Sequence, residues 1–86
     1  MTEFENTGEA RLLVVDDEPN IRDLLASSLR FAGFDVITAE DGASAYHQAQ
    51  EERPDLIVLD VMLPDMDGFT VTRRLRDAGI TIPVLF

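Results

Sequence analysis

The chain has 86 residues and a formal net charge of -10, with seven arginines, no lysine and no cysteine. This length allows one small domain with a modest core, and the lack of cysteine excludes disulfides and thiolate metal sites. The acidic charge argues against nucleic-acid binding by this segment, because such binding needs a cationic face; it favours metal cations and basic partners. No signal-peptide pattern and no run of about 18 apolar residues occurs, so we expect a cytoplasmic protein with no membrane contact.

The first half of the chain predicts a strand followed by a helix. Residues 1–10 are polar and acidic and are expected to form a flexible lead-in, whereas the apolar run 11–15 is expected to form a buried strand. Acidic residues and Pro19 mark the start of a helix that ends at Gly33. Its apolar residues recur at helical spacing and form one stripe: Ile21, Leu24, Leu25 and Leu29.

The second half repeats this alternation. Residues 34–39 are rich in β-branched side chains and predict a strand at an edge of the sheet, and a helix over 43–50 stops before Pro54. The near-continuous apolar run that ends at Asp60 predicts a strand buried on both faces. This strand is followed by a loop over 62–67, a helix over 69–78 and the start of a strand over 80–86. The apolar stripe of the helix over 43–50 is Ala43, Tyr46 and Ala49, and that of the helix over 69–78 is Val71, Leu75 and Ala78. Alternating strands and helices with short links imply an α/β fold with parallel strands and right-handed crossovers.

Carboxylates follow two of these strands. Asp60 closes one apolar run, and Asp16 and Asp17 close the run over 11–15. Because open α/β sheets bind ligands at the carboxyl ends of their strands, we expect these acids to form one cluster. A hard divalent ion would offset their repulsion, and oxygen-only ligands suit Mg²⁺. With such an ion held, one carboxylate can attack phosphorus as a nucleophile.

Helix capping is an alternative explanation for the acidic residues Asp16, Asp17 and Glu18. Acids in front of a helix commonly accept hydrogen bonds from its first N–H groups and compensate its dipole. The same explanation does not apply to Asp60, because no helix directly follows it. Asp60 is therefore the first candidate for chemistry.

Two motifs together resemble the receiver domain of two-component response regulators. They are Val-Val-Asp-Asp-Glu-Pro at 14–19 and Asp-Leu-Ile-Val-Leu-Asp-Val-Met-Leu-Pro-Asp-Met-Asp-Gly at 55–68, and the resemblance extends over 11–86. It implies that Asp60 accepts a phosphoryl group from a sensor histidine kinase and that the domain is a phosphoacceptor rather than an enzyme. It also implies a Mg²⁺ site, in which Asp17 and Asp60 are direct ligands, Asp16 acts through a water, and Met62 contributes its backbone carbonyl. Pro64 and Gly68 are implied to shape the loop that follows the acceptor.

The resemblance also implies a fold that these residues complete only in part. The family has a flavodoxin-like parallel sheet of order 2-1-3-4-5 with five helices, so residues 11–86 are expected to form an incomplete sheet of order 2-1-3-4, without the fifth strand and the last two helices. The family's Ser or Thr beyond its fourth strand and its Lys after the fifth have no counterpart here, since the chain reaches only 80–86 and contains no lysine. We therefore interpret the chain as a truncated receiver domain. The amino-acid sequence of residues 63–68 most resembles the same segment of regulators whose receiver precedes a winged-helix DNA-binding domain.

Two other functions compete with this interpretation. Aspartate-nucleophile phosphatases have a similar site, but they carry Asp-x-Asp after the first strand, whereas Asp16 and Asp17 are adjacent. A signalling-incompetent module that self-associates is the second alternative. An exposed apolar edge at 80–86 would favour a homodimer or larger assembly of this kind.

The remaining polar and soft side chains are assigned to structure. His47 has no convincing partner ligand at helical spacing and is expected to be solvated. Met62 and Met66 are expected to serve packing and loop formation. The arginines on the helix over 69–78 are expected to form its solvated face: Arg73, Arg74 and Arg76.

Overall fold

The computed structural model describes residues 9–86 of the chain. Most of the predicted lead-in, residues 1–8, lies outside the described residues. The elements alternate as predicted: β1 (Arg11–Val15), α1 (Pro19–Phe31), β2 (Asp35–Ala39), α2 (Gly42–Glu52), β3 (Leu56–Leu59), α3 (Gly68–Asp77) and β4 (Val84–Leu85).

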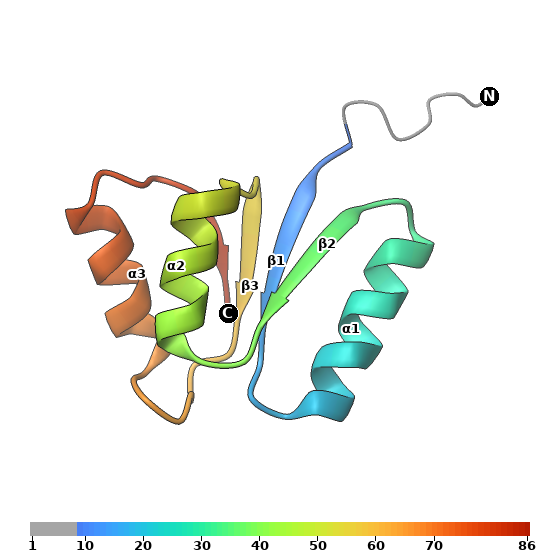
Figure 1. Ribbon diagram of the computed structural model, residues 1–86, viewed down its shortest axis with the longest axis horizontal. Helices are drawn as coiled ribbons and strands as arrows, with labels where there is room; N and C mark the ends of the chain where they lie inside the picture. The colour runs from blue at the N-terminus through green and yellow to red at the C-terminus, as the bar shows by residue number, and fades with distance from the viewer. Residues whose placement is uncertain (1–8) are drawn as a thin grey trace.

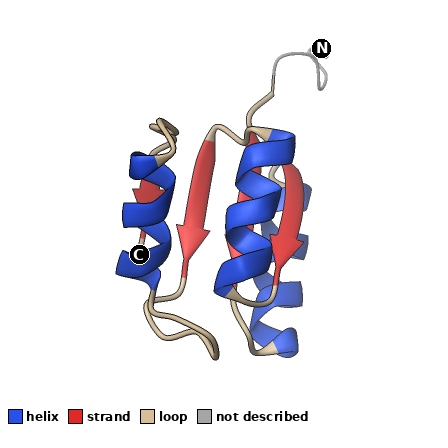
Figure 2. Cartoon of the chain, turned by 60° about the vertical axis from the view of Figure 1, so that its left-hand side comes forward, coloured by secondary structure: helices blue, strands red, loops and turns tan. Residues whose placement is uncertain are grey.

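The four strands form one parallel sheet in the order β2-β1-β3-β4. Helices α2 and α3 lie against one face of this sheet and α1 against the other (Figure 1; Figure 2). The α/β class, the strand order and the edge position of β2 are therefore confirmed. All loops that leave the carboxyl ends of β1, β2 and β3 emerge at the lower edge in Figure 1.

The core is divided by the sheet into two unequal parts. The larger part lies under α2 and α3 and consists of Leu13, Val15, Ala39, Ala45, Ala49, Ile57, Leu59, Val71, Leu75 and Ile80. The smaller part lies under α1 and consists of Val14, Ala26 and Val36. Strand β1 is buried on both faces because both parts use its side chains.

Strand β3 is buried on one face only, so the prediction of burial on both faces was wrong for half of its side chains. Ile57 and Leu59 are buried, whereas Leu56 and Val58 are half-buried. The reason is the position of α1, which packs on β1 and β2 and leaves its side of β3 partly uncovered.

The apolar stripe of α1 exists but is largely exposed. Leu24 is 68% exposed and Ile21 48% exposed, and the α1 side chain that enters the core is Ala26, which lies outside the predicted stripe. Helix α1 therefore presents an apolar face that no described residue covers.

The buried faces of α2 and α3 each differ from the predicted apolar stripe at one position. In α2, Ala45 is buried together with Ala49, whereas Ala43 is exposed. In α3, Ala78 is exposed and Ile80, beyond the helix, fills the core instead.

The segment after α3 is held by an arginine that was predicted to be solvated. Arg76 donates through one guanidinium nitrogen to the backbone oxygens of Ile80 and Ile82, at 2.9 Å each. Arg76 is nevertheless exposed, as are Arg73 and Arg74, so the predicted solvated face of the helix is confirmed. The predicted strand over 80–86 is limited to Val84–Leu85, which pairs with β3 at Ile57 and Val58.

Candidate functional site

The pairing of β1 with β3 brings the predicted acids together. The two strands run parallel and Val15 lies beside Leu59, so that Asp16 and Asp60 are the next residues of neighbouring strands. The Asp60 N–H donates to the Val15 oxygen at 3.1 Å, which continues the ladder to the first residue after β3. Both residues consequently lie at the carboxyl edge of the sheet, where open α/β folds bind ligands.

The three predicted carboxylates form one cluster. One oxygen from each of Asp16, Asp17 and Asp60 lies within 4.8 Å of the others, with Asp17 exposed and the other two side chains half-buried. Among residues 9–86, none of these carboxylates takes part in an ion pair; the recorded pairs both belong to Arg11. The cluster is thus an uncompensated all-oxygen donor set of the kind that hard divalent cations prefer.

Helix capping accounts for part of this acidic segment but leaves Asp17 unexplained. The N-cap of α1 is Glu18, whose carboxylate accepts from the Asn20 and Ile21 N–H groups at 2.9 and 3.3 Å. Asp16 accepts from the Glu18 N–H at 3.0 Å and so supports the turn into the helix. Within the described residues, no recorded hydrogen bond involves the Asp17 carboxylate, so capping does not explain its position.

The loop that follows Asp60 folds back on itself. One Asp60 carboxylate oxygen accepts from the Met62 N–H at 3.3 Å, and Met62 forms an isolated antiparallel bridge with Asp67. The Gly68 N–H donates to the Val61 oxygen at 2.7 Å. A Cβ at Gly68 would lie 2.8 Å from the Asp60 backbone oxygen, so only glycine allows this close approach to the candidate acceptor.

The other predicted residues of this loop have distinct surroundings. The Met62 side chain is 74% exposed, whereas Met66 is partly buried and packs against the larger core. Pro64 is exposed. His47, which lies on α2 outside this loop, is exposed as predicted.

Two further acids in the loop, Asp65 and Asp67, have structural roles that the sequence interpretation did not assign. Asp67 is the N-cap of α3 and accepts from the Thr70 N–H at 2.7 Å. Asp65 accepts from the Gly42 and Ala43 N–H groups at the start of α2. Hydrogen bonds from Thr70 lower the pKa of Asp67, and hydrogen bonds from the α2 N–H groups lower that of Asp65. An Asp followed by a helical segment could have indicated the Asp67 cap, but no local pattern indicates the contact of Asp65.

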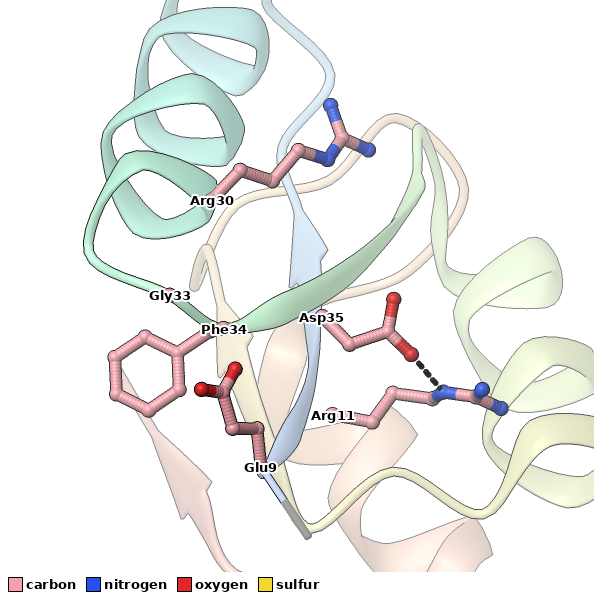
Figure 3. A pocket seen from close by; sticks show the side chains of 6 residues that line it. All are labelled: Glu9, Arg11, Arg30, Gly33, Phe34 and Asp35. Atoms are coloured by element: carbon pink, nitrogen blue, oxygen red, sulfur yellow. Dashed lines mark hydrogen bonds and ion pairs between the residues drawn. The ribbon is translucent and has the colours of Figure 1, made fainter. Parts of the chain in front are cut away.

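A cavity of about 490 Å³ lies away from the acidic cluster, at the start of β1 and β2 (Figure 3). Its Arg11 pairs with Asp35 at 2.7 Å and with Glu52 at 2.9 Å, and so joins β1, β2 and α2. Arg30, also in its lining, donates to the Val36 oxygen. Arg11, Asp35 and Arg30 of this lining are therefore already engaged in ion pairs or a backbone hydrogen bond.

The family follows from comparison with known proteins. Residues 12–86 match the model of the response regulator receiver domain. The chain belongs to this family. The resemblance inferred from the two motifs is thereby confirmed.

Relatives and solved structures of receiver domains agree with this assignment. The chain is 52% identical over 75 residues to the alkaline phosphatase synthesis transcriptional regulatory protein PhoP of Bacillus subtilis, which covers 87% of this chain and 31% of that protein. It is similar to the chemotaxis response regulator CheY4 of Vibrio cholerae, with 37% identity and a TM-score of 0.84 over 88% of this chain and 65% of that one. It is also similar to the response regulator TrrA of Thermotoga maritima in complex with Mg²⁺ and BeF, with 40% identity and a TM-score of 0.76 over 80% of this chain and 60% of that one.

These similarities confirm the flavodoxin-like receiver fold, in the sheet order 2-1-3-4 that was predicted for these residues. The chain spans about a third of the length of the PhoP protein. Among residues 9–86, no receiver helix is both long enough and apolar enough to cross a membrane.

The lowered pKa of Asp67 predicts how the receiver domain responds to acid. A carboxylate whose pKa is lowered by folding stabilises the native state above its unfolded pKa, about 3.9, and this contribution is lost as the pH falls through the folded value. We expect Asp67→Asn to be less stable than the unaltered chain at pH 7 and the difference to shrink below about pH 4. Urea unfolding midpoints of both proteins, measured with a chelator from pH 7 to pH 3, check this. A difference that stays constant or grows in acid would contradict it.

Proposed function

We propose that this chain is a phospho-accepting receiver domain in which Asp60 takes a phosphoryl group from a phosphohistidine of a sensor histidine kinase. The observation that carries the proposal is the convergence of Asp16, Asp17 and Asp60, within 4.8 Å, at the carboxyl edge of the sheet. The domain acts as a phosphoacceptor rather than as an enzyme that turns over a substrate.

The proposed step is a phosphoryl transfer with no change of oxidation state. A carboxylate oxygen of Asp60 attacks the phosphorus of the phosphoimidazole, and an O–P bond forms as the N–P bond breaks. The electron pair of the N–P bond stays on the imidazole nitrogen, which can take up a proton. The product is an aspartyl phosphate on a residue that is half-buried in the structure.

The residues present fit a Mg²⁺ ion. Asp17 and Asp60 would be direct ligands, Asp16 would act through a water, and Met62 would contribute its backbone carbonyl. This donor set is supported by the cluster of three carboxylates that no ion pair among residues 9–86 compensates. When bound, the ion would offset the negative charge of the carboxylates and of the phosphoryl oxygens. Pro64 and Gly68 would shape the loop that carries Met62, with Gly68 allowing the close approach to Asp60.

A role in controlling transcription is suggested by the relatives of this chain. PhoP of Bacillus subtilis is described as a transcriptional regulatory protein, and we propose that phosphorylation of this domain likewise controls a DNA-binding effector domain. We propose a cytoplasmic location, because the domain would there meet the proposed kinase partner. The receiver segment itself, with a net charge of -10, would not contact nucleic acid.

Phosphorylation by a small donor tests the acceptor directly. After incubation with acetyl phosphate and Mg²⁺, the intact mass of the chain is expected to rise by one phosphoryl group, and Asp60→Asn is expected to show no rise. Asp23→Asn, which removes an exposed acid from α1, serves as the matched control and is expected to be phosphorylated like the unaltered chain. A folded chain with an unshifted mass would overturn the phosphoacceptor and leave the assembly role described next.

A self-associating module is the second candidate, because this chain exposes large apolar side chains in two places. Leu24 and Phe31 are exposed on α1, and Leu85 and Phe86 are exposed at β4, an edge strand of the sheet. Unpaired strand edges and apolar patches favour association. We propose a homodimer or larger assembly through the β4 edge.

The assembly is tested by size-exclusion chromatography with light scattering. We expect a mass above that of one chain, and we expect Leu85→Lys to shift it toward the monomer, since a charge on an edge strand opposes pairing. Gln50→Lys, at an exposed position of α2 outside both apolar places, is the control and is expected to keep the mass of the unaltered assembly. A compact, folded monomer of the unaltered chain would rule out this association.

A further inference from the structure

The loop after Asp60 is hydrogen-bonded to the start of α2 through the side chain of Asp65. The two carboxylate oxygens of Asp65 accept separately from the Gly42 N–H at 2.8 Å and from the Ala43 N–H at 2.9 Å. These N–H groups belong to the first turn of α2 and have no acceptor within the helix. Asp65 therefore satisfies two donors of an element that lies 23 residues earlier in the chain.

A steric contact reinforces this attachment. A Cβ at Gly42 would lie 2.5 Å from the Met66 Cγ and 2.9 Å from its sulfur. Met66 is thus packed directly on the α2 backbone, and it also contacts the larger core. Two successive loop residues, Asp65 and Met66, bind the same helix start by independent interactions.

The base of the loop is fixed to the candidate site. Met62 and Asp67 bridge across the base, and the Met62 N–H donates to the Asp60 carboxylate at 3.3 Å. Asp65 lies between these two bridging residues in the sequence. A movement of Asp65 relative to α2 would therefore be passed through the bridge to Met62 and to the carboxylate of Asp60.

We propose that Asp65 is a positioning residue for the cation site: by tying the loop to the start of α2, it holds Met62 and Asp60 in the arrangement that binds a divalent ion. This inference rests on the proposed function. Asp65 itself is not part of the cluster of Asp16, Asp17 and Asp60, so it acts through the loop rather than as a ligand.

Affinity for Mn²⁺, measured from the electron paramagnetic resonance signal of the free ion, tests this role without requiring phosphorylation. Asp65→Ala is expected to weaken Mn²⁺ binding by about tenfold or more, the usual effect of losing a residue that orients metal ligands. Asp41→Ala is the matched control, because Asp41 caps the same helix through the Ser44 N–H at 2.8 Å and carries the same charge, but makes no recorded contact with the loop. Its affinity is expected to stay close to that of the unaltered chain.

The outcomes separate the two proposals. If the unaltered chain binds Mn²⁺ and the two alanine variants bind it equally well, or are weakened equally, the positioning role is wrong while the cation site stands. If the unaltered chain does not bind Mn²⁺, the proposed cation site fails and the positioning role fails with it. Circular dichroism verifies that each variant is folded, and Asp65→Asn compared with Asp41→Asn replaces the alanine pair if either alanine variant unfolds.

Discussion

The in-register pairing of β1 with β3 is the constraint on which the rest of this domain depends. Because Val15 lies beside Leu59, the acids that follow the two strands emerge together at one edge of the sheet. The side chains of β1 are buried on both faces, and a slip of one residue would move each of them to the opposite face. The packing of the core therefore fixes the register, and the register in turn fixes the distance between Asp16 and Asp60.

The charges at the two ends of the sheet differ in how they are compensated. Arg11 compensates two carboxylates, Asp35 and Glu52, at the amino ends of the strands. At the carboxyl end, Arg22 donates to the backbone oxygen of Asp16 rather than to a carboxylate. Within residues 9–86, the acidic cluster thus remains without a recorded partner charge, and a bound cation is the compensation that its all-oxygen donors favour.

The sequence alone allowed the fold class, the strand order and the three clustered acids to be predicted. The two motifs place Asp16, Asp17 and Asp60 directly after apolar runs, and parallel strands leave such residues at the same edge of the sheet. The fold class and the cluster of acids could be predicted from local patterns combined with a general rule of sheet topology, whereas the strand order was implied by the family resemblance of the two motifs.

The predictions that failed depend on tertiary contacts. Helical periodicity marked an apolar stripe on α1, but Ala26, outside the stripe, is the buried residue of this helix, and of the stripe Leu29 packs against the core. Arg76 is exposed, as predicted, but the sequence did not indicate that it also binds two backbone oxygens beyond its own helix. Asp65 accepts from N–H groups 22 and 23 residues away, and no local signal predicts a partner at that separation.

Line broadening by Mn²⁺ in the amide NMR spectrum tests the central claim most directly, because a bound paramagnetic ion broadens the signals of nearby residues. If Asp16, Asp17 and Asp60 hold one cation, substoichiometric Mn²⁺ should selectively broaden the amide signals of residues 15–18 and 59–62 and leave the cavity at residues 33–35 unaffected. Broadening spread evenly over the acidic surface, or centred on another group of carboxylates, would contradict the account.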